Sequence, residues 1–404
     1  MAKHRNIIGL DIGTHSIKLL SAYKKPNEDG FEVLGQVQNF SLGVRKGVVI
    51  DPQKVGETIS SLVLNAEKDT GHKIKSVYAN LGGSHLSCIS SKGIISVSRA
   101  DRKISEEDVD RAIQAGRTFL LPSNKEIIDI FPREFIVDGE RGIKQPSGLE
   151  GVRLEADVLA LCCFSPYLKN STQAVLSSGI QLNDFMPSSL ASAKAVLTPR
   201  EKELGVAILD IGAGTTDMAV FEEGEVIDVA VFPIGSENIT NDIAVCLPTD
   251  VDIAERIKLE FGTCEPQGSK KTKVSDRKIT IDGEEPLVFS QKKLNEIIEA
   301  RVCEIFGLAN KELKRISKNG LLPGGIVLVG GGSKLPGIKA LAKRELKLPC
   351  RIGIPESFFS LDNDPANATL CGLVMHGFDA EEENRGSRIN IFGWLKKGLR
   401  HFIP

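Results

Sequence analysis

Hydrophobic and polar positions alternate along much of this chain in short runs that end at glycine turns, a pattern typical of β-hairpins. The same arrangement occurs twice, far apart in the sequence. Apolar runs at 6–10 and 206–209 each lead to an aspartate, turn on glycine and resume as apolar runs at 16–21 and 216–221. The pattern therefore predicts two similar hairpins, and not loops that lead into helices.

The remaining pattern mixes strands with helices, which indicates an α/β protein. Further strands are predicted at 31–38, 47–50, 76–81, 86–98, 134–137, 156–163, 182–186 and 324–329. Helices are predicted at 52–70, 105–118, 166–178, 187–197, 250–261 and 291–317. The second of these begins with a capping box that runs from Ser105 to Asp108. The stretch at 268–277, rich in charge, is predicted to be an exposed loop or hairpin.

Composition limits the class of protein. The chain has 404 residues, of which 41% are hydrophobic and 26% charged, enough for large cores in two domains or a few subdomains. The formal net charge of -2 provides no general attraction for nucleic acid, so none is expected as a partner. The polar first residues and the short apolar run after them do not form a signal peptide, and we expect a cytoplasmic protein.

Cysteine and histidine offer little chemistry here. The eight cysteines show no C-x-x-C spacing, so we expect reduced thiols in the core. The six histidines form no i,i+4 pair on a helix. Neither a hydrolase triad nor a catalytic metal centre is supported.

The two hairpin turns have the chemistry of a phosphate site. Glycine lets backbone amides approach an anion closely, the neighbouring hydroxyls add donors, and Lys18 lies an even number of residues beyond Thr14, on the same strand face. Each turn alone also occurs in ordinary hairpins, so the pairing carries the prediction. The predicted phosphate-binding residues are Gly13, Thr14, Ser16, Lys18, Gly212, Gly214, Thr215 and Thr216. Asp11 and Asp210 would repel phosphate and are predicted to hold Mg²⁺ through water.

A third glycine-rich turn follows the apolar run at 324–329. It matches neither the Walker A pattern nor the dinucleotide-binding fingerprint. Backbone without side chains lets a flat ring approach closely, although such turns also occur for packing alone. Glu255 could accept a hydrogen bond from a ribose hydroxyl, or could lie on a solvated helix face.

The C-terminal residues form a separate unit. Residues 379–388 are acidic, polar and broken by glycine, and they predict a flexible linker. Residues 389–402 place apolar side chains on one helix face and cations on the other, as in helices that lie on anionic membranes. A helix docked on the protein's own core is the alternative. The predicted membrane-binding residues are Phe392, Trp394, Leu395, Lys396, Lys397, Leu399, Arg400 and Phe402.

These motifs resemble those of the superfamily that includes actin, sugar kinases and heat-shock chaperones. The stretches 203–212, 235–244, 254–258 and 322–328 are similar to FtsA, the family of actin-like bacterial division proteins, and the resemblance covers essentially the whole chain. It implies an α/β, actin-like two-domain fold of duplicated ribonuclease H-like domains, with an inserted α/β subdomain and a C-terminal amphipathic helix.

The resemblance also implies domain limits. Residues 1–83 and 163–198 would form the first domain, and residues 199–235 and 296–378 the second domain with its return to the first. The inserted subdomain would span 84–162 and make polymer and partner contacts. A second insertion would span 236–295, followed by the linker at 379–388 and the membrane helix at 389–404.

By the same resemblance the cofactors are ATP and Mg²⁺, and the adenosine would lie among Glu255, Lys258, Gly330, Gly331, Lys334 and Leu335. The tail of the tubulin-like protein FtsZ would dock at Asn241, Asp242 and Arg301. The protein would polymerise, anchor FtsZ to the cytoplasmic face of the inner membrane at the division site, and recruit later division proteins.

One departure from the family concerns catalysis. The chain has Met186-Pro187 where many relatives carry an acidic residue before the proline, and the following helix contains no glutamine to orient a water. Its nearest polar positions are Ser192 and Lys194. We therefore predict ATP binding with weak or absent hydrolysis. A pilus-assembly adaptor and a small-molecule kinase of the same superfamily remain the alternatives.

Overall fold

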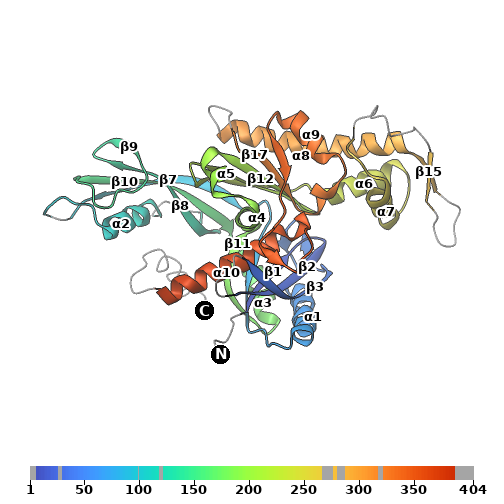
Figure 1. Ribbon diagram of the computed structural model, residues 1–404, viewed down its shortest axis with the longest axis horizontal. Coiled ribbons are helices and arrows are strands. Elements are labelled where there is room, and N and C mark those ends of the chain that lie inside the picture. The colour runs from blue at the N-terminus through green and yellow to red at the C-terminus, as the bar shows by residue number, and fades with distance from the viewer. Residues whose placement is uncertain are drawn as a thin grey trace.

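The computed structural model describes residues 6–25, 30–98, 100–117, 122–265, 276–279, 287–316 and 322–386. Figure 1 shows a lower domain that holds the N-terminal strands, an upper domain, and a smaller subdomain that projects to one side. Both large domains consist of a mixed sheet covered by helices. The fold class predicted from the sequence is confirmed for these residues.

The first domain contains a six-stranded sheet in the order β11-β6-β1-β2-β3-β19. Its strands are β1 (Ile7–Ile12), β2 (Ser16–Lys24), β3 (Phe31–Phe40), β6 (Ser76–Leu81), β11 (Gln181–Pro187) and β19 (Phe358–Phe359). A small hairpin of β4 (Val44–Arg45) and β5 (Val48–Val49) follows β3. Helices α1 (Pro52–Thr70) and α3 (Ser165–Ser177) pack in one apolar cluster with β1, β2 and β6. Helix α10 (Ala368–Gly386) packs in another with residues of β1, β2 and β6.

The second domain repeats this topology. Its sheet runs β14-β13-β12-β17-β18, with three antiparallel strands and then two parallel ones, the order of β3-β2-β1-β6-β11 in the first domain. The strands are β12 (Val206–Ile211), β13 (Thr216–Glu222), β14 (Glu225–Phe232), β17 (Gly325–Val329) and β18 (Cys350–Ile352). The repeat explains why the sequence pattern occurs twice.

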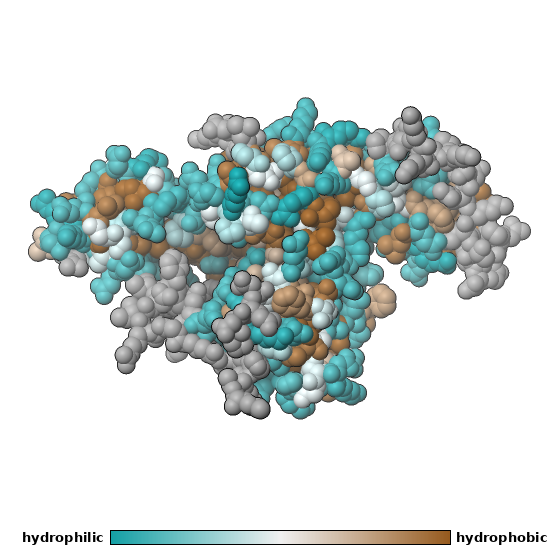
Figure 2. Space-filling model, viewed as in Figure 1, coloured by the Kyte–Doolittle hydropathy of each residue, from teal (hydrophilic) through white to brown (hydrophobic). Residues whose placement is uncertain are grey.

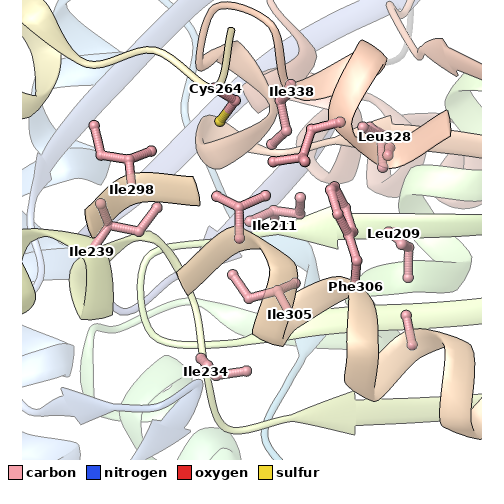
Figure 3. Packing of buried hydrophobic residues seen from close by; sticks show 14 of the residues in the cluster. Leu209, Ile211, Ile234, Ile239, Cys264, Ile298, Ile305, Phe306, Leu328 and Ile338 are labelled. Carbon is pink, nitrogen blue, oxygen red and sulfur yellow. The ribbon is translucent and has the colours of Figure 1, made fainter. Parts of the chain in front are cut away.

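Helical segments cover one face of the second sheet, and α4 (Ser188–Val196) packs against the other. The covering helices are α6 (Ser236–Cys246), α7 (Val251–Phe261), the long α8 (Gln291–Ile316) and α9 (Ile338–Leu346), and the short 3₁₀ helix η1 (Gly331–Lys334) follows β17. Figure 3 shows Phe306 and Ile305 of α8 packed with Leu209 and Ile211 of β12 and with Leu328 of β17. The hairpin of β15 (Asp276–Ile279) and β16 (Leu287–Ser290) precedes α8.

The inserted subdomain has the sheet β7-β10-β8-β9 and helix α2 (Glu106–Arg117). Its strands are β7 (Ser87–Ser96), β8 (Lys125–Val137), β9 (Glu140–Ile143) and β10 (Arg153–Phe164). The capping box is confirmed, because the Asp108 amide donates to Ser105 Oγ and the Ser105 amide to the Asp108 carboxylate. Leu159 and Leu161 of β10 share an apolar cluster with Val229 of β14, so the subdomain packs on the second domain as well as on the first.

The chain crosses between the large domains twice. The chain passes from the first to the second through α4 (Ser188–Val196) and the short α5 (Pro199–Leu204), and it returns through the 3₁₀ helix η2 (Pro365–Asn367) into α10. Helices α4 and α10 lie against each other beneath the second sheet (Figure 1). The cleft between the domains therefore borders both connections.

Some predictions from the sequence were incomplete. Strand β8 is far longer than the predicted 134–137, while β14 and α6 were not anticipated. The interpretation of 379–388 as a flexible linker is wrong for residues 379–386, which continue α10. Alanine and glutamate favour helix there, the core-packed start of α10 supplies the nucleus, and Asp379 forms an ion pair with Lys194. The predicted membrane helix at 389–404 lies outside the described residues.

Among the described helices, none is both long and apolar enough to cross a lipid bilayer. Figure 2 shows hydrophobic residues on this face in several separate areas among hydrophilic ones, over the inserted subdomain and over both large domains.

Candidate functional site

A cavity of about 780 Å³ lies between the two large domains. Both hairpin turns, the start of α6, one face of α7, the glycine-rich turn at η1 and the segment before α10 line it. All six residues predicted to contact adenosine are among the lining residues, as are both predicted metal residues. Six of the eight predicted phosphate residues also line it: Gly13, Thr14, Ser16, Lys18, Gly212 and Thr215.

The two hairpins correspond residue by residue. Asp11 pairs with Lys18 across the first hairpin, and Asp210 pairs with Asp217 across the second. Each turn is closed by the same bond, because the amide of its first glycine donates to the residue three positions on: Gly13 to Ser16 O, at 3.1 Å, and Gly212 to Thr215 O, at 2.9 Å. Next to the turns the hairpins differ in charge, because Lys18 on β2 occupies the register position of Asp217 on β13.

The hairpin turns meet at the base of the cavity. Gly47, at the tip of the β4–β5 hairpin, donates its amide to Thr14 Oγ1 at 2.9 Å. Gly214 lies so close to Thr14 and Lys46 that a Cβ atom would overlap the Thr14 side chain. The amides of Ser236 and Glu237 at the start of α6 donate to the carbonyls of Gly212 and Ala213. Carbonyl oxygens that would repel an anion are thus engaged with α6.

Three carboxylates face this region. Burial raises the pKa of Asp11 to about 6 against the lowering effect of Lys18, and it also raises the pKa of Asp210. Burial followed by the charge of Asp210 raises the pKa of Asp217 to about 7. Asp217 accepts from Thr215 Oγ1 at 2.8 Å, and its other oxygen, Oδ1, is buried without a hydrogen-bond partner.

These carboxylates suit a divalent cation. Like charges destabilise one another at low dielectric constant, and a cation among them relieves both the repulsion and the unpaired Asp217 oxygen. Within the described residues, no group of three Asp, Glu, His or Cys side chains is close enough to hold a metal ion. A magnesium ion here would need phosphate oxygens and water as further ligands, which is its usual preference.

The opposite end of the cavity contains a buried lysine. Lys258 Nζ lies 2.7 Å from Glu255 and donates to Thr240 Oγ1 at 2.8 Å. Gly330, in the glycine-rich turn, has φ of +83° and adjoins Asp210, since a Cβ there would overlap a carboxylate oxygen of Asp210. Only glycine fits this position, because side chains rarely adopt this backbone conformation and no space is left for one.

Several predicted residues lie elsewhere. Thr216 is buried, does not line the cavity, and donates its hydroxyl to Ile234 O at 2.9 Å, because strand alternation turns it away from its neighbour Thr215. Gly214 contacts the first domain instead of lining the cavity. Asn241, Asp242 and Arg301 lie on α6 and α8, away from the cavity lining. The eight predicted membrane residues lie outside the described residues.

Sequence reasoning missed other lining residues. Asp217 could have been found, since it follows Thr215 by the same two positions that separate Lys18 from Ser16. Asn80 and Ser188 had no such signal. Asn80 accepts from the Ile12 amide at 2.6 Å and donates to Ser188 Oγ at 3.1 Å, contacts that join three distant segments.

Two protein-family models match parts of this chain. The family model described as cell division protein FtsA matches residues 207–372, and the model described as the SHS2 domain inserted in FtsA matches residues 83–162. The cell division protein FtsA of Pseudomonas aeruginosa is 34% identical over 394 residues, which cover 96% of this chain and 92% of that protein.

Solved structures show the same fold at lower identity. A structure of the PilM-PilN type IV pilus biogenesis complex matches with a TM-score of 0.65 and 18% identity, over 93% of this chain and 99% of that one. A crystal structure of MreB5 of Spiroplasma citri bound to ADP matches with a TM-score of 0.57 and 14% identity, over 95% and 99% of the two chains.

The first prediction concerns Asp217 in the ligand-free protein. Because its pKa is raised from 3.8 to about 7, the folded state loses stability as the pH rises through that interval. We expect Asp217→Asn to raise the unfolding temperature at pH 8 by about 2–5 °C and to have little effect at pH 4. Calorimetric scans across this range measure the difference. Asp252→Asn, at an exposed position of α7, is the control. A benefit of Asp217→Asn that is equal at both pH values would contradict the prediction.

Proposed function

Because the chain belongs to the FtsA family of cell division proteins, we propose that it binds ATP with Mg²⁺ between its two domains and links FtsZ filaments to the membrane. One observation carries the nucleotide part of the proposal: two equivalent glycine hairpins, one from each domain, face a single cavity, and Asp11, Asp210 and Asp217 line it beside their turns. A phosphate chain with a divalent cation supplies the charges that this arrangement lacks.

Each end of the cavity suits one part of the nucleotide. The hairpin turns and the Lys18 ammonium would bind the phosphates. Asp11, Asp210 and Asp217 would hold Mg²⁺, partly through water, and the ion would neutralise phosphate charge. Glu255, Lys258 and Gly330 would border the adenosine. Thr240 already bonds to both the buried Lys258 and the partly exposed Glu255, so little side-chain entropy would be lost on binding.

Binding is proposed without fast hydrolysis. The residue of α4 that lines the cavity is Ser188, and its hydroxyl accepts a hydrogen bond from Asn80. A serine side chain is shorter than the glutamine that orients an attacking water in related proteins. Of the two polar positions considered from the sequence, Ser192 donates its hydroxyl to Asp210 and Lys194 forms an ion pair with Asp379. The proposed role of ATP is therefore to favour the closed, polymer-forming arrangement of the domains.

The docking site for the FtsZ tail is proposed on α6 and the first half of α8. Arg301 is not available as a free cation, because it binds both carboxylate oxygens of Asp242 at 2.7 Å and Glu304 at 2.6 Å. Its proposed role is to position α6 against α8. Asn241 is exposed, and Val245, one turn later on the same face, is 78% exposed. These two side chains are accessible to a peptide.

Membrane attachment is proposed through residues 389–404, which follow α10. Since α10 packs on the first domain, a helix beyond it would be delivered from that domain. One short amphipathic helix binds weakly, and a polymer that presents many copies gives stable attachment. The protein would then lie on the cytoplasmic face of the inner membrane at the division site, and the inserted subdomain would be available to later division proteins.

The two alternative functions, a pilus-assembly adaptor and a small-molecule kinase, have less support. The likeness to the pilus complex, at 18% identity, extends to the fold alone. A small-molecule kinase would need an acceptor site with a free carboxylate base beside the phosphates, and would have no use for the amphipathic tail. Transfer of labelled phosphate from ATP to a small molecule would favour the kinase.

The second prediction concerns nucleotide binding. Asp210→Asn should weaken the affinity for ATP in the presence of Mg²⁺ by about tenfold to a hundredfold, because one charge of the proposed cation site is lost. Affinity for ATP in EDTA should change far less. Titration calorimetry measures both, with Asp252→Asn as the exposed control. Equal Mg-ATP affinity of variant and wild type would show that Asp210 has no part in metal binding.

The third prediction concerns the FtsZ tail. Val245→Asp should reduce the affinity for an FtsZ C-terminal peptide by roughly tenfold or more, because it places a charge in an apolar contact. Leu204→Asp, at another exposed apolar position, should leave it unchanged. Fluorescence anisotropy with a labelled peptide measures both. If the two variants bind as the wild type does, the docking face lies elsewhere.

The fourth prediction concerns the tail of the chain. Removal of residues 389–404 should abolish co-sedimentation with phosphatidylglycerol vesicles while ATP affinity is kept. Lys396→Glu with Lys397→Glu should weaken vesicle binding and make it less sensitive to salt. Undiminished co-sedimentation of the truncated chain would exclude the tail as the anchor.

A further inference from the structure

The segment that leads into α10, together with the first two residues of that helix, bonds to side chains of four elements that line the cavity. We name residues 364–369 the junction segment, because they connect the second domain to α10. Four of its residues, Asp364, Ala366, Asn367 and Thr369, line the cavity. Side chains from β2, β3, η1 and β12 all bond to these six residues.

Each of these contacts is short. Lys18 Nζ donates to Ala366 O at 2.8 Å, and Gln36 Nε2 donates to Asn367 Oδ1 at 3.0 Å. Lys334 Nζ lies 2.7 Å from Asp364, and the Gly330 amide donates to Pro365 O at 3.0 Å. Thr369 Oγ1 donates to Asp210 Oδ2 at 2.8 Å. All five partners line the cavity themselves, so a ligand there would meet the same groups.

The Asp210 contact joins both connections between the domains. Its Oδ2 atom also accepts from Ser192 Oγ of α4 at 2.6 Å, and Ser192 Oγ lies 2.7 Å from Thr369 Oγ1. Ser192 is 0% exposed and Thr369 is 6% exposed. One carboxylate oxygen of the second domain is therefore held by hydroxyls from α4 and α10, the two helices through which the chain leaves and returns.

Helices α4 and α10 are packed too closely to move independently. A Cβ atom at Gly372 would overlap the carbonyl of Ala191, so the two backbones touch at this crossing. Farther along, Gly377 packs in the same way against Tyr78 of β6. A displacement of Thr369 would therefore be passed along α10 as a whole, since close-packed interiors transmit strain.

A charged ligand would compete for these contacts. Phosphate oxygens would attract the Lys18 ammonium away from Ala366 O, and a divalent cation would attract the Asp210 carboxylate away from Thr369 and Ser192. We propose that the junction segment senses occupancy of the cavity and transmits it to α10. Ser192 and Thr369 are the positioning residues of this device. The inference rests on the proposed binding of Mg-ATP.

The test is hydrogen exchange of α10 amides in the full chain, with and without Mg-ATP. In the wild type, Mg-ATP should change the exchange rates of α10 by roughly threefold or more, because the bonds at its first turn are redistributed. Thr369→Val keeps the shape of the side chain but removes the hydroxyl, and should abolish this response. Thr369→Ser restores a hydroxyl and should restore the response.

A matched pair on α4 separates this role from packing. Ser192→Ala should strengthen Mg-ATP binding by roughly fivefold to tenfold, because the cation no longer has to displace this hydrogen bond to Asp210, and should leave the affinity for ATP in EDTA unchanged. Ser189→Ala is the control, because Ser189 lies on the same helix, is equally buried and has a hydroxyl without a partner. A purely structural role of Ser192 would change unfolding temperature without changing the dependence on Mg²⁺.

The outcomes distinguish the two levels of inference. A wild-type chain that binds Mg-ATP while α10 exchanges at the same rate would overturn the sensor and leave the proposed function intact. A Thr369→Val variant that responds as the wild type does would also overturn it. A wild-type chain that binds no nucleotide would overturn both.

Discussion

The structure depends on three carboxylates, those of Asp11, Asp210 and Asp217, that line the cleft between the two domains. Asp11 comes from one domain and Asp210 with Asp217 from the other, and burial raises the pKa of each. Such a group of like charges is unfavourable unless a cation joins it. The two domains therefore have a site whose electrostatic balance is completed from outside the chain, which is a reason for ligand binding and domain closure to be coupled.

Because the fold is duplicated, one short hairpin pattern that occurs twice creates this site. The same hairpin occurs at the same place in both sheets, and the close approach of Gly214 to Thr14 brings the turns together. The copies differ where it matters chemically, because Lys18 occupies in one the position of Asp217 in the other. In the proposed function, one half would thus contribute a cation for phosphate and the other an additional carboxylate for metal.

Contacts beyond the cleft explain how the remaining parts could respond to it. The inserted subdomain packs on β14 of the second domain, so it does not move only with the domain from which its chain emerges. Thr369, in the first turn of helix α10, is bonded to Asp210, and the helix continues to Gly386. The cleft is therefore connected by short bonded paths to the elements proposed to serve assembly and membrane attachment.

The sequence alone determined what depends on neighbours along the chain. Strand alternation, turn glycines and the capping box at Ser105 are local, so the hairpins, most helices and the part of the cavity lining that the two hairpin turns form could be predicted. Which groups remain available was decided by contacts between distant segments. Thr216 donates its hydroxyl to Ile234 O, and Arg301 donates to Asp242. Asn80, Ser192 and Thr369 enter the site from other elements. Packing on the first domain made the acidic segment at 379–386 helical, because tertiary contacts stabilise a helix start that composition does not reveal.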